Sequence, residues 1–300
     1  WNFKTELRTI SRYQGDFGEW GNTMKRWGKI LSGVIILIVA WQVAAQSGIW
    51  SVYVLPPPAR VAQALWTMIQ SGMLWQHVFV SFKRVLEGFS IAFALAFLGG
   101  ILAYELPEVE EYYKGLLEFM RNVPPISLIA LLILWFGIGE TSKIIIIVLA
   151  SFFPIYLNIR KGFVSGDRKL LEVGAVFGLN RWEIFRRIVL PGAVPDILVG
   201  MKVGMGYSWR AIIGAEMIAA SKGIGYLILD AQQMSRSDKV IAGILTIGIV
   251  GMLCNQLFEF LIHWVLNKRK LEGGSGCQLP TSERKWKGVP VKCYENQGPV

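Results

Sequence analysis

A run without a single charged residue, between residues 30 and 59, restricts this chain more than any other feature of its sequence. About 20 consecutive apolar residues are enough to cross the hydrocarbon core of a bilayer as a helix. Residues 30–45 are almost wholly apolar, and the prolines of Leu55-Pro56-Pro57-Pro58 stop any helix that reaches them. The run predicts a first transmembrane helix. A cleavable signal peptide is the alternative, disfavoured by the long polar lead at 1–29 and by the lack of a clear small-residue cleavage site.

The composition also indicates that the lipid bilayer is the main solvent of this chain. Hydrophobic residues make up 53% of the chain and charged residues 17%, whereas soluble proteins carry about 25% charged residues. These values exclude a cytosolic enzyme and a disordered tail, and three cysteines are too few for a disulfide scaffold. The net charge of +10 is better explained by basic residues that flank membrane spans than by nucleic-acid binding.

The remaining hydrophobic pattern predicts an all-α polytopic membrane protein with about six transmembrane helices. Residues 59–70 form a short amphipathic helix that is too short to span. The domains expected are a cytoplasmic segment at 1–29, a membrane domain at 30–268 and a flexible tail at 269–300, which opens with a linker-like Gly-Gly-Ser-Gly composition. The five further spans are expected at 85–104, 126–139, 144–159, 193–220 and 240–266.

The distribution of Lys and Arg predicts the orientation of these spans. With the N-terminus inside, the cytoplasmic segments hold more than twice as many Lys and Arg as the external ones. Positive residues are enriched in cytoplasmic loops, so both termini are expected in the cytoplasm. The segment 105–121 is net acidic, but the rule counts Lys and Arg rather than net charge.

The polar loop at 160–192 is the most informative segment for function. It reads as one helix, a break at Gly178, a second short helix with Trp182 and Phe185 on one face, and a stop at Pro191. Two amphipathic helices outside the membrane suit either a protein partner or the lipid surface, and the pattern alone does not choose between them.

The spacing of residues in this loop resembles the cytoplasmic-loop signature of permease subunits of binding-protein-dependent ABC importers. In that signature a Glu is followed six residues later by Gly, and after nine more residues by Ile-x-Leu-Pro. The matching positions here are Glu172, Gly178, Ile188, Leu190 and Pro191. The two alanines usual after the glutamate are replaced by Val173 and Gly174.

Two other stretches narrow the resemblance to the nitrate, sulfonate, taurine and bicarbonate subfamily. Their residues are most similar to those of the aliphatic sulfonate and taurine permeases. One runs from Arg121-Asn122-Val123-Pro124-Pro125 to Glu140, and the other is Ala215-Glu216-Met217-Ile218 followed by Gly223-Ile224-Gly225. The likeness covers residues 30–268.

The resemblance implies a type I ABC importer permease in a bacterial cytoplasmic (inner) membrane, working as a homodimer. Each copy would bind a cytoplasmic ATP-binding ABC subunit and receive solute from an extracytoplasmic solute-binding protein. The loop would be the coupling helix, and nucleotide-driven closure of the ATPases would tilt it and open the path outward. The residues that this implies for ATPase coupling are Glu172, Gly178, Trp182, Phe185, Ile188, Leu190 and Pro191.

The chain's own residues predict no catalytic centre. It lacks the G-x-x-x-x-G-K-[ST] loop that cradles nucleotide phosphates, so ATP and Mg are expected on the partner ATPase and no cofactor in this chain. Its two histidines, His77 and His263, and its scattered cysteines predict no metal site.

The fifth expected span is unusually polar because it contains Lys202, Arg210 and Glu216. A charge at the bilayer centre costs about 2.5–3.5 kcal/mol on insertion scales, so these side chains should face a pore, a partner or one another. One hypothesis is that Lys202 and Arg210, eight residues apart on nearly the same face, attract an anionic solute along the translocation path. The alternative is structural: Arg210 and Glu216 are six residues apart, which disfavours a pair within the helix but permits one across a dimer.

Several functions stay open at this point. Sulfonate, taurine, nitrate, bicarbonate or a neutral vitamin precursor could be the solute, because affinity in such systems resides largely in the separate binding protein. A non-transporting membrane scaffold with the same fold is the competitor from another class. An ion channel is poorly supported, because no selectivity-filter or charge-ring pattern occurs.

Overall fold

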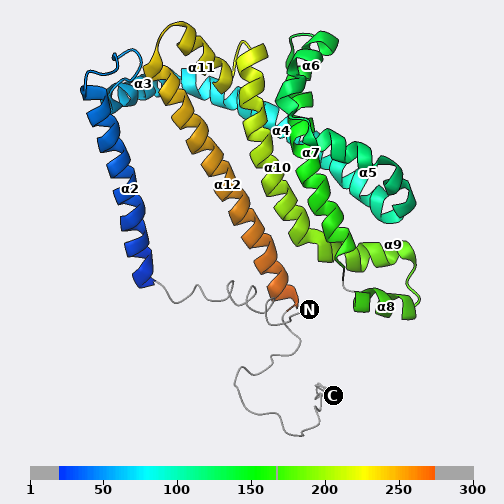
Figure 1. Cartoon of the computed structure of the whole chain (residues 1–300). Helices are drawn as coiled ribbons and strands as arrows, with labels where there is room; N and C mark the ends of the chain where they lie inside the picture. The colour runs from blue at the N-terminus through cyan, green and yellow to red at the C-terminus, as the bar shows by residue number, and fades with distance from the viewer. Residues whose placement is uncertain (1–19, 167, 274–300) are drawn as a thin grey trace. The chain divides into compact units, whose positions relative to one another are not determined.

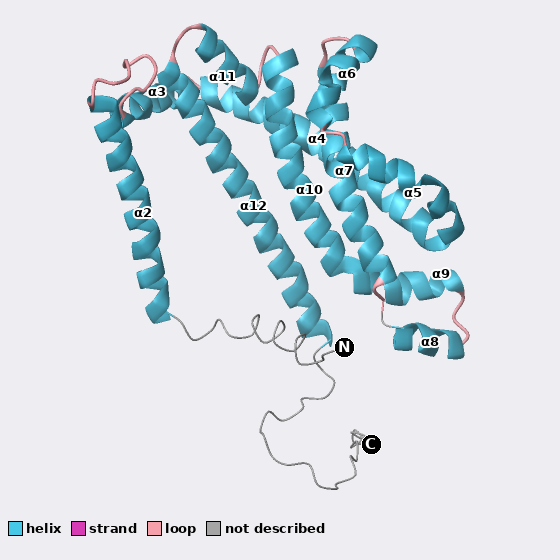
Figure 2. Ribbon diagram, in the orientation of Figure 1, coloured by secondary structure: helices cyan, strands magenta, loops and turns pink. Residues whose placement is uncertain are grey.

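A computed structural model describes residues 20–166 and 168–273, and every regular element in these residues is a helix (Figure 2). Internal contacts divide the chain into residues 1–262 and residues 263–300, and each unit is described by itself. In the second unit the described residues continue the last helix to residue 273. The expected tail beyond it and the start of the basic N-terminal segment lie outside the described residues.

Four helical stretches are long and apolar enough to cross a membrane: Met73–Glu105, Glu140–Val164, Arg181–Ala219 and Ser237–Asn267. They contain four of the expected spans. The span expected at 126–139 is the second half of a pair of helices bent by 88°, which counts as a fifth span if the pair is one. The first expected span lies in α2 (Trp20–Gln46), of which residues Ser32–Gln46 form a shorter apolar helix.

The helix α3 (Pro58–Gln70) is the amphipathic helix expected at 59–70. Pro57 is its N-cap in extended conformation and Pro58 occupies its first turn, where a missing backbone N–H costs nothing. Val61, Ala64 and Met68 are its buried residues, which fits an amphipathic helix. The indole nitrogen of Trp41 in α2 donates to the carbonyl of Pro56 at 3.1 Å, which ties α2 to the proline turn.

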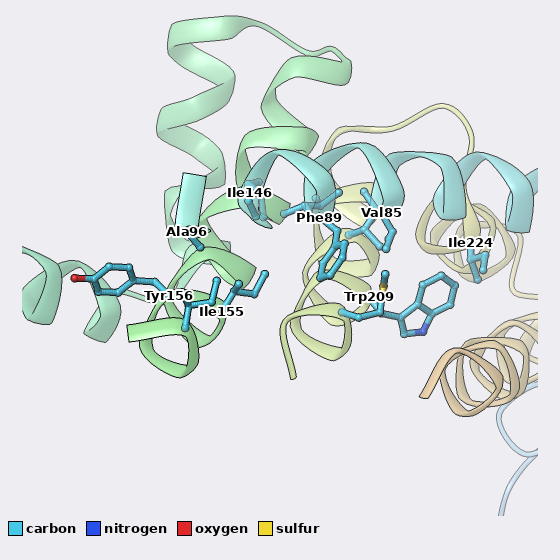
Figure 3. Packing of buried hydrophobic residues seen from close by; sticks show 14 of the residues in the cluster. Val85, Phe89, Ala96, Ile146, Ile155, Tyr156, Trp209 and Ile224 are labelled. Carbon is cyan, nitrogen blue, oxygen red and sulfur yellow. The ribbon is translucent and has the colours of Figure 1, made fainter. Parts of the chain in front are cut away.

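Three helices form the core of the first unit: α4 (Met73–Glu105), α7 (Glu140–Val164) and α10 (Leu190–Ala219). Figure 3 shows Phe89, Ile155 and Trp209 from these helices within this packing. Glycines allow the helices to approach closely, since a Cβ at Gly88 would lie 2.7 Å from Ile147 and one at Gly200 would lie 2.8 Å from Asn158. In α10, Gly204 and Gly214 also pack closely, whereas Gly206 faces open space.

The remaining helices connect the ends of this core. Both α8 and α9 follow the C-terminal end of α7, whereas α11 follows the opposite end of α10 (Figure 1). We call these the α8–α9 end and the α11 end. Their bounds are α5 (Pro107–Asn122), η1 (Pro125–Leu128), α6 (Ile129–Phe136), α8 (Arg168–Val176), α9 (Arg181–Ile184), the π-helical turn η2 (Phe185–Val189), α11 (Ile224–Gln233) and α12 (Ser237–Gly273).

Candidate functional site

The helices α8 and α9 lie on either side of Gly178, as the sequence predicted. The predicted stop at Pro191 was wrong: α9, η2 and α10 form one helical stretch, Arg181–Ala219, because Pro191 lies in the first turn of α10, where proline is tolerated. Gly178 has a φ of 72° and separates α8 from α9; this left-handed conformation favours glycine. The side chain of Asn180 then accepts from the backbone N–H of Glu183, whose carboxylate accepts from the N–H of Asn180. This reciprocal cap starts α9 directly after the break.

Phe185 anchors this pair of helices to the membrane core. Its side chain is 1% exposed, and its ring lies 5.3 Å from that of Tyr104 and 5.2 Å from that of Phe163, centroid to centroid. Arg181 adds an ion pair to Glu105 at 3.0 Å. The α8–α9 pair is therefore attached to the ends of both α4 and α7.

The pair also exposes apolar side chains. Val176, Phe177 and Trp182 are more than half exposed, and the Trp182 ring stacks on that of Phe185 with 5.5 Å between the centroids. Glu172 is exposed on α8. Gly174 faces inward, where a Cβ would lie 2.9 Å from Ile188. This close contact explains why glycine can replace the alanine usual at this position. Ile188 and Leu190 are partly buried, and Pro191 is exposed at the start of α10.

The structure separates the three charged residues of the fifth span. Lys202 forms an ion pair with Glu259 of α12. Arg210 instead lies over the ring of Tyr207, 5.7 Å from its centroid, and lines a cavity against α7. The expectation that Lys202 and Arg210 share one face was wrong, because eight residues leave about 80° of rotation between them.

Glu216 lies in a buried cluster at the α11 end, and its side chain is 0% exposed. Its carboxylate accepts from the Ser81 hydroxyl at 2.8 Å, from Arg84 Nη1 at 2.8 Å and from the backbone N–H of Gly225 at 3.0 Å. The carboxylate thus joins α4, which is more than 130 residues away in the sequence, to the segment nine residues after Glu216. Neither Arg210 nor a dimer partner is needed to explain how this charge is accommodated.

Arg84 extends the cluster to the start of α7. Its Nε and Nη2 donate to the two oxygens of Glu140 at 2.5 and 2.7 Å, and Lys143 donates to the same carboxylate at 2.8 Å. Nη1 also donates to the backbone carbonyl of Lys222. Ser81, Arg84, Glu140 and Glu216 are named the Arg84 cluster from here on.

The loop between α10 and α11 is shaped by this cluster. Gly223 has a φ of 128°, and a Cβ there would overlap the Glu216 carboxylate. The backbone N–H of Gly223 donates to His77 Nδ1 at 3.0 Å and that of Ile224 to Ser81 Oγ at 2.9 Å. These contacts explain the Gly223-Ile224-Gly225 stretch. Sequence reasoning missed Arg84 and Glu140; an arginine inside an apolar helix was the available signal.

The cavity beside Arg210, of about 620 Å³, lies between α7, α10 and the segment that joins α5 to η1. Arg210 and Arg121 both line it, among apolar side chains that include Ile126, Phe153 and Leu157. Neither arginine forms an ion pair with a described residue, and the described lining contains no carboxylate. We call this space the Arg210 cavity.

Comparison with known proteins identifies the architecture. A family model for the binding-protein-dependent transport system inner membrane component matches residues 92–270. The putative aliphatic sulfonates transport permease protein SsuC of Bacillus subtilis is 36% identical over 243 residues, which cover 81% of this chain and 88% of the relative. The taurine transport system permease protein TauC of Escherichia coli is 33% identical over 223 residues, which cover 73% of this chain and 81% of the relative.

A solved structure shares the fold at low sequence identity. An inward-facing conformation of the MetNI methionine ABC transporter aligns with a TM-score of 0.59 at 14% identity, covering 66% of this chain and 98% of the matched one. These findings confirm the resemblance that the loop signature indicated. The chain belongs to the inner-membrane permease subunits of binding-protein-dependent ABC importers, in the branch that contains SsuC and TauC.

Proposed function

We propose that this subunit forms the translocation path for a small organic anion of the sulfonate or taurine class. The observation that carries the proposal is the Arg210 cavity, where two arginines face apolar side chains without a carboxylate among the described lining residues. A guanidinium binds an oxyanion through two parallel hydrogen bonds. The names of two relatives, an aliphatic sulfonates permease and a taurine permease, agree with this solute class.

The partners proposed follow from the two ends of the molecule. A cytoplasmic ATP-binding subunit, which would hold ATP and Mg, docks on the exposed apolar face of α8 and α9. A solute-binding protein delivers the solute at the α11 end, and a second copy of this chain completes the path. Both termini are then cytoplasmic, as the Lys and Arg distribution predicts.

ATPase docking is tested by substitutions in α8 and at the break. Gly178→Trp should abolish co-purification of the ATPase, because it strains a left-handed backbone position and adds bulk to the exposed face. Glu172→Lys should weaken docking by reversing an exposed charge. Lys83→Gln, on a side chain 66% exposed outside this face, is the matched control. Undiminished co-purification with both loop variants would refute the docking proposal.

The solute class is tested by uptake into vesicles that contain the permease, the ATPase and the binding protein. Ethanesulfonate and taurine should be taken up with ATP hydrolysis, and nitrate or bicarbonate should compete weakly. Uptake of nitrate, bicarbonate or a vitamin precursor with no uptake of either sulfonate would overturn the solute class. Absence of any solute-dependent ATP hydrolysis would favour the membrane scaffold.

A further inference from the structure

A second cavity adjoins the Arg210 cavity and shares part of its wall. It has a volume of about 130 Å³ and is lined by residues of α5 and α7. Arg121, Phe153 and Leu157 line both cavities. The second cavity adds two further cations, Lys114 and Arg160, together with Glu118. We call it the Lys114 cavity.

The two cavities follow one another along α7 toward the α8–α9 end. The residues of α7 that line them run from Leu149 in the Arg210 cavity to Arg160 in the Lys114 cavity. At 1.5 Å per residue this corresponds to about 16 Å along the helix axis. Cations from three helices therefore line the two cavities: Arg210 of α10 lines the first, Arg121 of α5 lines both, and Lys114 of α5 and Arg160 of α7 line the second.

Arg121 is placed at this junction by the end of α5. It lies in the last turn of that helix, where a positive charge is favoured by the helix dipole. The segment that follows, Val123-Pro124-Pro125, leaves the helix in extended conformation at Val123 and Pro124. Within the part of the chain that the structure describes, Arg121 forms no ion pair.

We propose that the two cavities are consecutive binding sites for the transported anion and that Arg121 transfers it from one to the other. The ligand is an oxyanion with a short apolar body, such as an alkylsulfonate. This inference rests on the proposed function and names a new specificity-determining residue for it. The oxyanion moves from the guanidinium of Arg210 to that of Arg121, while Phe153 and Leu157 contact the apolar body throughout.

The lining favours an anion over the other possible occupants. Arg121 and Arg210 are both exposed residues in an otherwise largely apolar lining, so they can donate charge-assisted hydrogen bonds to a bound oxyanion. Glu118 of the Lys114 cavity is the one carboxylate in the described lining of the two cavities. A cavity of about 620 Å³ also lies within the range of roughly 300–1,000 Å³ that small-molecule sites occupy. Packing by a second copy of the chain is the competing occupant.

The sharpest test labels a thiol introduced at the junction. In a chain whose Cys254, Cys277 and Cys293 are replaced by serine, Leu157→Cys places a thiol in the wall of both cavities. A thiol reagent that carries an ethylsulfonate group should label it about tenfold faster than a reagent of similar size that carries a trimethylammonium group, because of the neighbouring positive charges. Ethanesulfonate should slow this labelling.

Arg121→Gln in the same background should reduce the preference for the anionic reagent severalfold, and Arg121→Lys should restore most of it. Lys83→Gln, which also removes one positive charge, should leave the preference unchanged. Equal labelling by both reagents, or an unchanged preference in Arg121→Gln, would overturn the proposal. Disulfide-linked dimers that form through the introduced thiol and exclude both reagents would assign the cavity to a subunit contact and overturn it as well.

Uptake separates this inference from the proposed function. In vesicles with saturating binding protein and solute, Arg121→Gln should reduce ethanesulfonate uptake at least about tenfold, and Arg121→Lys should recover part of it. If the unsubstituted complex takes up no sulfonate, the proposed function fails. If the complex transports sulfonate and Arg121→Gln transports it equally well, only the role of Arg121 fails.

Discussion

Arg210 and Glu216 of α10 lie six residues apart, about 9 Å along the helix, and their charges have opposite surroundings. Glu216 belongs to the Arg84 cluster, where hydrogen bonds to Ser81, Arg84 and Gly225 satisfy a carboxylate that is 0% exposed. Arg210 faces an open cavity and forms no ion pair among the described residues. The structure thus gives Glu216 a structural role, whereas the proposed role of Arg210 is to bind the solute.

The comparison also explains how the α11 end is held together. A buried charge is tolerated only when it is paired and hydrogen-bonded, and the Arg84 cluster supplies those partners from α4, α7 and the loop before α11. Glu140 is the partly open member, with its side chain 58% exposed. The cluster therefore fixes three helices at one end, and it shares no residue with the cavity between α7, α10 and the α5–η1 segment.

The largest effect on stability is expected from Arg84→Met. The substitution leaves Glu216 buried without its cation, which typically costs about 3–5 kcal/mol in the free energy of unfolding. Thermal unfolding of the purified chain in detergent measures the loss. Lys83→Met removes the neighbouring, exposed charge and should unfold like the unsubstituted chain. Equal melting temperatures for the two variants would mean that the Arg84 cluster does not hold the helices together.

A smaller loss is expected from Gly223→Ala. The backbone φ of 128° at this position is unfavourable for alanine, and its Cβ would overlap the Glu216 carboxylate. The expected cost is about 1–3 kcal/mol in the free energy of unfolding. Gly206→Ala is the matched control, since a Cβ at this helical glycine meets nothing within 4 Å and alanine favours the helix by up to about 1 kcal/mol. Urea or thermal unfolding should therefore shift in opposite directions for the two variants, and parallel shifts would contradict the described loop geometry.

A still smaller effect is expected from Lys202→Gln. The ion pair with Glu259 is partly exposed, at 31% and 49% of the two side chains, and such pairs contribute about 0–1 kcal/mol. Uptake should be unchanged, because Lys202 faces α12 rather than the Arg210 cavity. A large loss of uptake at unchanged stability would instead indicate that Lys202 lines the translocation path.

The sequence predicted the features that depend on local pattern. The break at Gly178, the amphipathic α3 and the apolar stretches of α4, α7, α10 and α12 follow from residue spacing, so they could be anticipated. The resemblance at Glu172, Gly178 and Pro191 likewise identified the family before the fold was described.

The features that depend on tertiary contact could not be predicted in this way. Arg84 and Glu140 are 56 residues apart, and Arg84 and Glu216 are 132 residues apart, so no periodicity relates them. Lys202 and Arg210 were expected on one face, yet the rotation between them directs one to Glu259 and the other to the cavity. The bend of 88° between the α5 segment and the helix after Pro125 was also not apparent from hydropathy.

The most direct test compares Arg210→Gln with Glu216→Gln for both unfolding and uptake. Glu216→Gln should lower the free energy of unfolding by about 3 kcal/mol, whereas Arg210→Gln should change it by no more than about 0.5 kcal/mol. In vesicles at matched protein levels, Arg210→Gln should reduce ethanesulfonate uptake at least about tenfold, since a charge-assisted hydrogen bond contributes about 1.5–3 kcal/mol. Unchanged uptake by Arg210→Gln, or unfolding of that variant at the same temperature as Glu216→Gln, would contradict the separation of a structural charge from a solute-binding one.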